Sequence, residues 1–183
     1  MTKRGKMTVL KLYTYPEPVL KKKAQKVDKV DDETRQLLDD MLETMYADAG
    51  VGLAAPQVGV SKRIVVIDVH QEDDEETGEL RKGTPLFLVN PSIIWHSDEK
   101  VCGEEGCLSV PGQRAEVERY AQVKVHYTDY NGKEQEILGD GLLSVCLQHE
   151  LDHLDGVLYI DRISRLKRQM IIKKLLKTQS SHD

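Results

Sequence analysis

Residues 141–154 read Gly-Leu-Leu-Ser-Val-Cys-Leu-Gln-His-Glu-Leu-Asp-His-Leu, and this stretch predicts the element around which the rest of the chain folds. Apolar residues lie on most sides of a helix drawn through it, which is typical of a helix buried inside a globular protein. His149 and His153 are four residues apart, so their rings lie one turn above each other on the same face. The stretch therefore predicts a buried central helix that carries two histidines on one side.

The five residues from His149 to His153 form the pattern His-Glu-x-x-His. In this pattern two imidazoles bind one metal ion and the glutamate serves as a base, here Glu150. Two histidines and a carboxylate are costly to bury unless each finds a partner, which further favours a metal. A hydrolytic site of this type takes a third protein ligand and leaves a fourth position to water.

The sequence after the central helix does not supply that third ligand. The spacing that delivers a third histidine in one related pattern delivers Tyr159 here, and no glutamate follows Glu150. A cysteine thiolate upstream is therefore a strong candidate. Cys107 lies in a glycine-bounded polar stretch typical of a site loop, whereas Cys146 lies one turn before His149, and the pattern leaves both open. The upstream chain also contains His70, His96 and His126.

Outward from the central helix, the chain predicts two further helices and several short strands. Asp31 or Asp32 caps a helix with apolar residues at helical spacing, and Gly50 and Gly52 are expected to end it and open a loop. A last helix is expected from about Ser164. The predicted strands are residues 9–15, 64–69, 86–89, 117–120, 123–127 and 134–138, with a hairpin turn at Asn131-Gly132.

This order of elements predicts an α+β fold. Short antiparallel β-sheets are expected to wrap around the buried central helix, with an N-terminal and a C-terminal helix beside them. A length of 183 residues suits one core, so we expect a single catalytic domain over residues 1–183. Residues 1–6 are expected to be a flexible extension, residues 164–183 a basic helix and tail, and the acidic residues 72–76 part of a solvated hairpin tip.

Composition excludes several classes of protein. Hydrophobic residues at 39% and charged residues at 31% describe an ordinary globular protein. No apolar run is long enough to cross a bilayer, and no apolar signal core follows the basic start, so we expect a cytoplasmic protein without membrane contact. Three cysteines, an odd number, disfavour a disulfide framework.

A formal charge of -5 disfavours a binder of DNA or RNA over the whole surface. Basic residues nevertheless gather near the C-terminus, where Asp161 is the nearby acid. This basic patch consists of Arg162, Arg165, Lys167, Arg168, Lys173, Lys174 and Lys177. It predicts either a solvated face or a contact with RNA phosphates.

Three segments resemble the signature motifs of peptide deformylases, in the order in which the family has them. They are Gly50-Val51-Gly52-Leu53-Ala54-Ala55-Pro56-Gln57, Glu105-Gly106-Cys107-Leu108-Ser109 and Gln148-His149-Glu150-Leu151-Asp152-His153. Three motifs in register are highly specific, and the resemblance runs from about Met7 to the C-terminal helix, as in the bacterial type with such a helix. It implies metal-dependent hydrolysis of the N-formyl group from the N-terminal formylmethionine of nascent polypeptides, with release of formate.

The resemblance also implies roles for individual residues. The implied metal ligands are Cys107, His149 and His153. The implied catalytic residues are the base Glu150, the side-chain amide of Gln57 and the backbone N–H of Leu108, the last two as donors to the developing oxyanion. The implied substrate-binding residues are Val51, Gly52, Arg114, Leu142, Val145 and Cys146. Gly103 stands where relatives can carry a larger apolar side chain, so we expect a more open outer wall of the pocket.

One divalent ion per chain is implied, with Fe(II) favoured, although a thiolate and two imidazoles suit Zn(II), Ni(II) and Co(II) equally well. Relatives with a similar C-terminal helix dock at the ribosomal tunnel exit, so ribosome contact through the basic patch is a further expectation.

Two alternatives use the same residues. A zinc endopeptidase would employ the same His-Glu-x-x-His site, but the chain lacks the third histidine or later glutamate of such enzymes. A structural metal site would be closed by a fourth protein ligand, for which Cys146 is the candidate. An RNA-binding module led by the basic patch would explain none of the three motifs.

Overall fold

The computed structural model describes residues 6–73, 75–77 and 80–181. Its helices are α1 (Asp32–Ala47), α2 (Gly141–Leu154) and α3 (Arg165–Gln179), with short 3₁₀ helices η1 (Pro18–Lys21), η2 (Ala55–Val58) and η3 (Tyr159–Arg162). Its strands are β1 (Gly52–Ala54), β2 (Ile64–Ile67), β3 (Glu72–Asp73), β4 (Leu80–Arg81), β5 (Leu86–His96), β6 (Lys100–Cys107), β7 (Val110–Tyr120), β8 (Gln122–Thr128) and β9 (Glu134–Asp140). All strand pairs within the sheets are antiparallel, and the predicted α+β class is confirmed.

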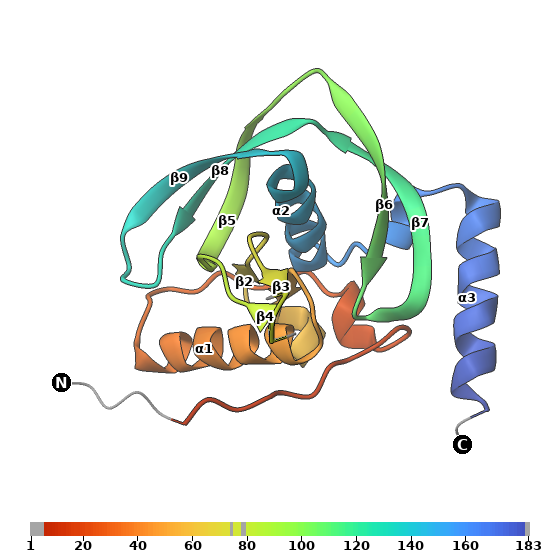
Figure 1. Ribbon diagram of the computed structural model, residues 1–183, viewed down its shortest axis with the longest axis horizontal. Coiled ribbons are helices and arrows are strands. Elements are labelled where there is room, and N and C mark those ends of the chain that lie inside the picture. The colour runs from red at the N-terminus through yellow and green to blue at the C-terminus, as the bar shows by residue number, and fades with distance from the viewer. Residues whose placement is uncertain (1–5, 74, 78–79, 182–183) are drawn as a thin grey trace.

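A five-stranded sheet in the order β1-β2-β5-β8-β9 separates α1 from α2 (Figure 1). Successive side chains of a strand point to opposite faces of a sheet, and β2 follows this rule while being buried on both sides. Val65 and Ile67 pack in the cluster that contains α2, whereas Ile64 and Val66 pack against α1. The sheet therefore fixes the two helices relative to each other.

Helix α2 lies between the large sheet and the hairpin of β6 and β7, as Figure 1 shows. The Asp140 side chain caps its first turn by accepting a hydrogen bond from the backbone N–H of Gly141 at 2.7 Å. The chain turns away after Leu154 through Gly156, whose φ of +74° and close approach to the Lys21 carbonyl require a residue without a side chain. The predicted buried helix is thus present with both histidines inside it.

Helix α1 begins where the sequence predicts. Asp31 is its N-cap and accepts a hydrogen bond from the backbone N–H of Thr34 at 2.9 Å. The helix ends at Ala47, and Gly52 then opens strand β1 rather than lying in a loop, which corrects the expectation for that segment. β1 is an edge strand of the large sheet.

The predicted strand over residues 9–15 is wrong. This segment is extended, but its N–H groups bond to other elements and not to a neighbouring strand. Leu10 N–H donates to Thr44 Oγ1, Tyr13 N–H to the Gln57 carbonyl and Tyr15 N–H to the Ser109 carbonyl, each at 2.8 Å. The segment therefore ties η2 to the turn between β6 and β7.

Strand β6 was not among the predicted strands. Its first five residues, from Lys100, are all exposed, so the sequence shows no alternation of apolar and polar residues there. β5 and β7 also extend well beyond the predicted 86–89 and 117–120, whereas the turn at Asn131-Gly132 is confirmed, with Gly132 at a φ of +80°.

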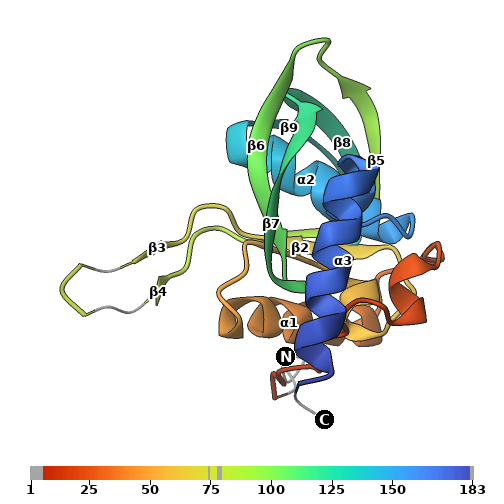
Figure 2. The ribbon, with the colours of Figure 1, turned by 90° about the vertical axis from the view of Figure 1, so that its right-hand side faces the viewer.

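Ser164 caps α3, which packs on the outer side of β7 through the buried Ile171 and Leu175 (Figure 2). Three other apolar residues of this helix, Leu166, Met170 and Leu176, are exposed. Figure 2 also shows the hairpin of β3 and β4, on which the acidic segment lies, projecting away from the remainder. Of the expected N-terminal extension, residues 1–5 lie outside the described residues, as do residues 74, 182 and 183. No helix in the described ranges is long and apolar enough to span a bilayer.

Candidate active site

Cys107, His149 and His153 lie together, with one donor atom from each within 4.8 Å of the others. Cys107 ends β6, and the two histidines share one face of α2. Cys107 Sγ is 3.3 Å from His153 Nε2. A tetrahedral ion bound at ordinary sulfur and nitrogen distances would separate two such donors by about 3.6 Å, so the three residues fit one metal ion. Cys146 is not part of this group among the described residues.

A cavity of about 610 Å³ opens beside this cluster, between α2, β6–β7 and the start of β1. Every residue that the sequence singled out for the site lines it except His153, which is buried behind the wall. These lining residues are Val51, Gly52, Gln57, Cys107, Leu108, Arg114, Leu142, Val145, Cys146, His149 and Glu150. The cavity thus brings together all three sequence motifs.

Glu150 projects into this cavity from the same turn of α2 as the histidines. It is 5% exposed, and burial raises the pKa of its carboxyl to about 7. Its Oε2 is a buried oxygen without a hydrogen-bond partner in the described part of the chain. Such an oxygen is costly to bury unless a proton, a water or a cation meets it. The arrangement is that of a proton acceptor beside a metal site.

Gly52 lies directly against Glu150. A Cβ atom at Gly52 would stand 2.6 Å from Glu150 Oε1, which is too close for any side chain unless the Glu150 side chain or β1 shifts. Glycine at this position therefore allows the edge strand β1 and the carboxylate to lie in contact.

Gln57 is held in place by both ends of its amide. Its Oε1 accepts the backbone N–H of Ala54 at 2.9 Å, and its Nε2 donates to Ser109 Oγ at 3.2 Å. The same Nε2 is 3.5 Å from Cys107 Sγ, so the amide is aimed at the metal cluster. The Ser109 hydroxyl in turn donates to the Tyr13 carbonyl at 2.8 Å.

His149 Nδ1 is 2.8 Å from Glu105 Oε1, which leaves the other ring nitrogen for the cluster. Glu105 also accepts two hydrogen bonds from Arg119, each at 2.9 Å. Burial alone would raise the pKa of Glu105, but the bonds from His149 and Arg119 outweigh it and lower that pKa to about 2. The same carboxylate and the Cys107 sulfur raise the pKa of His149 against the effect of its burial.

The sequence had not pointed to Arg119. It stands 14 residues from Glu105 and 33 from Asp152, and no periodicity links these positions. The sequence offered one signal, the position of Arg119 two residues after the apolar Val117, which puts both side chains on the same face of the predicted strand 117–120.

Cys146 forms part of the cavity wall, one turn from His149 on α2. Its thiol is buried, and burial together with the nearby carboxylates Glu150 and Glu105 raises its pKa to about 12. A thiol in these surroundings stays protonated and behaves as a small apolar group.

A sequence model of the polypeptide deformylase family matches residues 9–169. The peptide deformylase of Phenylobacterium zucineum (strain HLK1) is 52% identical over 171 residues, which make up 93% of this chain and 97% of that protein. A crystal structure of peptide deformylase from Ehrlichia chaffeensis is similar with a TM-score of 0.87 and 45% identity, over 96% of this chain and 99% of that one. A Met-Ala-Ser bound crystal structure of class I type b peptide deformylase from Acinetobacter baumannii gives a TM-score of 0.78 and 37% identity, over 86% and 100%.

Proposed function

Because this chain belongs to the polypeptide deformylase family and removes the formyl group from nascent polypeptides, we propose that the cavity beside α2 is where this hydrolysis takes place. The observation that carries the proposal is the cluster of Cys107, His149 and His153, together with Glu150, which lines the same cavity as Cys107 and His149. A thiolate, two imidazoles and an adjacent carboxylate are the parts of a metal-dependent amidohydrolase.

The single metal ion of the family would be held by Cys107, His149 and His153. Bound there, it would lower the pKa of a water molecule and polarise the formyl carbonyl. We assign Fe(II) as the physiological ion, while Zn(II), Ni(II) and Co(II) suit the same donors. Metal analysis of protein prepared without oxygen is expected to give one iron per chain, and another metal in that amount would contradict the iron assignment.

Glu150 is the group that moves the proton. It accepts one from the attacking water and returns it to the nitrogen of the leaving amine. A carboxyl whose pKa lies near neutrality is suited to both steps, and burial brings Glu150 into that range. The products are formate and a free N-terminal amine.

Gln57 and Leu108 stabilise the oxygen that becomes anionic in the transition state. The Gln57 amide is fixed by Ala54 and Ser109, so it pays little ordering cost when the charge develops. Leu108 follows Cys107 directly and lines the same cavity, and its backbone N–H is proposed as the second donor.

The methionine side chain of the substrate is proposed to lie against the apolar wall made by Val51, Leu142, Val145 and Cys146. Arg114 stands at the rim, where it pairs with Glu104 at 3.0 Å. Nothing lies within 4 Å of a Cβ built on Gly103, and an open outer wall of the pocket stays a prediction. The Met-Ala-Ser complex of the Acinetobacter baumannii relative makes formyl-Met-Ala-Ser a suitable substrate for tests.

The direct test is formate release from formyl-Met-Ala-Ser, measured beside cleavage of an unformylated peptide that offers only internal peptide bonds. We expect formate from the first and no cleavage of the second. Cleavage of internal bonds without formate release would favour the zinc endopeptidase alternative, whereas the relatives named above are peptide deformylases.

Replacing Gly52 with alanine is expected to lower kcat/KM for formyl-Met-Ala-Ser by about ten- to a hundredfold. The new methyl group would collide with the Glu150 carboxylate and displace it by a fraction of an ångström or more, and small misplacements of catalytic groups have effects of about this size. Gly103→Ala is the matched control, since its added methyl meets nothing within 4 Å. Equal activity of the two variants would contradict the proposed role of the contact.

We also propose that the exposed face of α3 contacts the ribosome. Two arginines of the basic patch are engaged within the chain, Arg162 with Asp152 and Arg168 with Asp161. The remaining members are exposed and available to RNA phosphates: Arg165, Lys167, Lys173, Lys174 and Lys177.

Reversing three of these charges with Lys173→Glu, Lys174→Glu and Lys177→Glu is expected to abolish salt-sensitive co-sedimentation with ribosomes while leaving formate release unchanged. The control is the same triple reversal at the exposed Lys22, Lys23 and Lys26, which alters net charge equally. Loss of co-sedimentation in both variants, or in neither, would rule out α3 as the contact.

Residues 1–183 are proposed to act as one catalytic unit in the cytoplasm. Gln57 and His153 stand far apart in the sequence and serve the same cavity, so no division of the chain between them would leave a complete site. The N-terminus of a nascent polypeptide becomes accessible at the ribosome, which places the reaction in the same compartment.

A further inference from the structure

A charged network of side chains continues from the metal cluster through the protein to its surface. Arg119 bonds to Glu105 on one side and, through Nη1, to Asp152 Oδ2 at 2.7 Å on the other. Asp152 then accepts two hydrogen bonds from Arg162, from Nε at 2.9 Å and from Nη2 at 2.6 Å. The order is therefore His149, Glu105, Arg119, Asp152 and Arg162.

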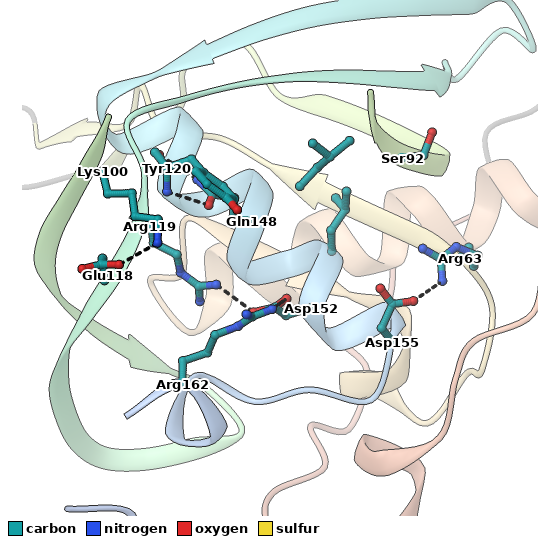
Figure 3. A pocket seen from close by; sticks show the side chains of 12 residues that line it. Arg63, Ser92, Lys100, Glu118, Arg119, Tyr120, Gln148, Asp152, Asp155 and Arg162 are labelled. Atoms are coloured by element: carbon teal, nitrogen blue, oxygen red, sulfur yellow. Dashed lines mark hydrogen bonds and ion pairs between the residues drawn. The ribbon is translucent and has the colours of Figure 1, made fainter. Parts of the chain in front are cut away.

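The outer part of this charged network, Arg119, Asp152 and Arg162, borders a second hollow of about 400 Å³ on the side of α2 away from the metal cluster. Figure 3 shows Arg119 and Arg162 reaching Asp152 from two directions, with Arg63 paired to Asp155 further along the helix. The charged side chains around this hollow are paired with one another, so its wall offers no free charge that would call for a small-molecule ligand.

The exposed fraction of the side chains changes sharply along the charged network. The Arg119 side chain is 4% exposed, whereas that of Arg162 is 47% exposed. Arg162 ends η3, just before α3 begins, and does not line the cavity beside the metal cluster. A contact at the surface is thereby connected to a metal ligand by four consecutive hydrogen-bonded pairs.

We infer that Arg162 is a positioning residue for the metal ligand His149, acting through Asp152, Arg119 and Glu105, and that it slows release of the bound metal ion. This inference rests on the proposed ligand set of Cys107, His149 and His153.

The physical argument begins at the ligand. Glu105 fixes the orientation of the His149 ring and increases its basicity as a ligand, and partners of this kind commonly change metal affinity by about ten- to a hundredfold. Arg119 donates to both oxygens of Glu105 and so holds the carboxylate in the position from which it contacts His149. Arg119 is in turn shared between Glu105 and Asp152.

Charge balance explains the contribution of Arg162. Glu105 and Asp152 carry two negative charges, and Arg119 and Arg162 carry two positive charges. Without Arg162, Arg119 is the remaining charged partner of Asp152 in the charged network. Asp152 then competes with Glu105 for Arg119. The hydrogen bond between Glu105 and His149 is then weakened, although no residue of the cavity has been changed.

The test uses the full-length protein loaded with Co(II), whose visible absorption follows its coordination, and measures the rate of cobalt release to an excess of chelator. Arg162→Met is expected to release cobalt about three- to tenfold faster than the unchanged protein, less than the change expected for a direct partner of a ligand. Arg162→Lys keeps the charge but lacks the two-pronged contact with Asp152, so an intermediate rate is expected.

Arg168→Met is the matched control. Arg168 lies six residues further on and pairs with Asp161 at 3.0 Å, and this pair is not part of the charged network that leads to His149. Its loss should leave the release rate unchanged. Release from Arg162→Met at the unchanged rate, or equal acceleration in Arg168→Met, would overturn the inference.

A second comparison separates positioning from general destabilisation. In protein that already carries Glu105→Ala, no side chain connects Arg119 with His149, so adding Arg162→Met should produce no further acceleration. Additive effects of the two substitutions would overturn the inference. Failure of the unchanged protein to bind one equivalent of cobalt would instead refute the ligand set, and the inference with it, before any variant is compared.

Discussion

Glu150→Gln is expected to lower kcat for formate release from formyl-Met-Ala-Ser by about 10²- to 10⁴-fold, the range typical of a lost general base. Glutamine has the same shape but accepts no proton from water and returns none to the amine. Cys107 and the two histidines are untouched, so the variant should keep one metal ion per chain. Parallel measurement of formate and of bound metal checks both statements.

The same substitution should make the metal-free chain more stable. Burial raises the pKa of Glu150 from 4.5 to about 7, so the folded protein resists ionisation that the unfolded chain undergoes readily. This carboxyl therefore lowers the free energy of unfolding progressively as the pH rises from about 4.5 to about 7. Glutamine carries no charge, and thermal unfolding of the metal-free variant at pH 8 should occur at a higher temperature.

Glu104→Gln provides the control for charge removal. Glu104 lines the same cavity but is exposed and pairs with Arg114 rather than with the reacting groups. It should retain most of the activity. Near-normal kcat in Glu150→Gln would refute the assignment of Glu150 as the base.

Gln57→Glu is expected to lower kcat/KM by about 10²- to 10³-fold, the cost of removing one oxyanion donor. Glutamate can still accept the Ala54 N–H, so the local backbone keeps its hydrogen bond while the donor is lost. A negative charge also takes the place of the amide beside the developing anion. Steady-state kinetics with formyl-Met-Ala-Ser measures the loss.

Gln113→Glu introduces the same charge elsewhere on the cavity wall and serves as the control for that effect. Its activity should fall far less than that of Gln57→Glu. If the two variants lose activity to the same extent, added charge rather than the missing donor is responsible.

The helix α2 and its histidines were predictable because the information is local. Residues four apart meet on one helical face whatever surrounds them, and the apolar residues around His149 indicated burial. Asp31, Ser164 and Gly132 were equally readable, because caps and turns depend on a few neighbouring residues.

The choice between Cys107 and Cys146 could not be made from periodicity. Cys107 reaches the cluster because β6 pairs with β7. The first half of β6 is exposed on both faces, so no apolar pattern in the sequence predicts this strand. The family resemblance supplied what the local pattern lacked.

The ion pairs behind His149 were beyond sequence reasoning for a different reason. Glu105, Arg119 and Asp152 each belong to a different element, and their meeting depends on how the hairpin lies against α2. The prediction of a strand over residues 9–15 was wrong for the same reason. Tyr13 and Tyr15 have an extended backbone, but tertiary structure determines its hydrogen-bond partners.

The hairpin of β6 and β7 forms a two-stranded sheet of its own, with no ladder to the five-stranded sheet. Cys107 belongs to that hairpin, and both histidines belong to the helix that it faces. An ion shared by these three residues is consequently a cross-link between the hairpin and the body formed by the large sheet and α2, which share no strand ladder. Its binding energy contributes to folding as well as to chemistry, so the cofactor and the architecture of its cavity stabilise each other.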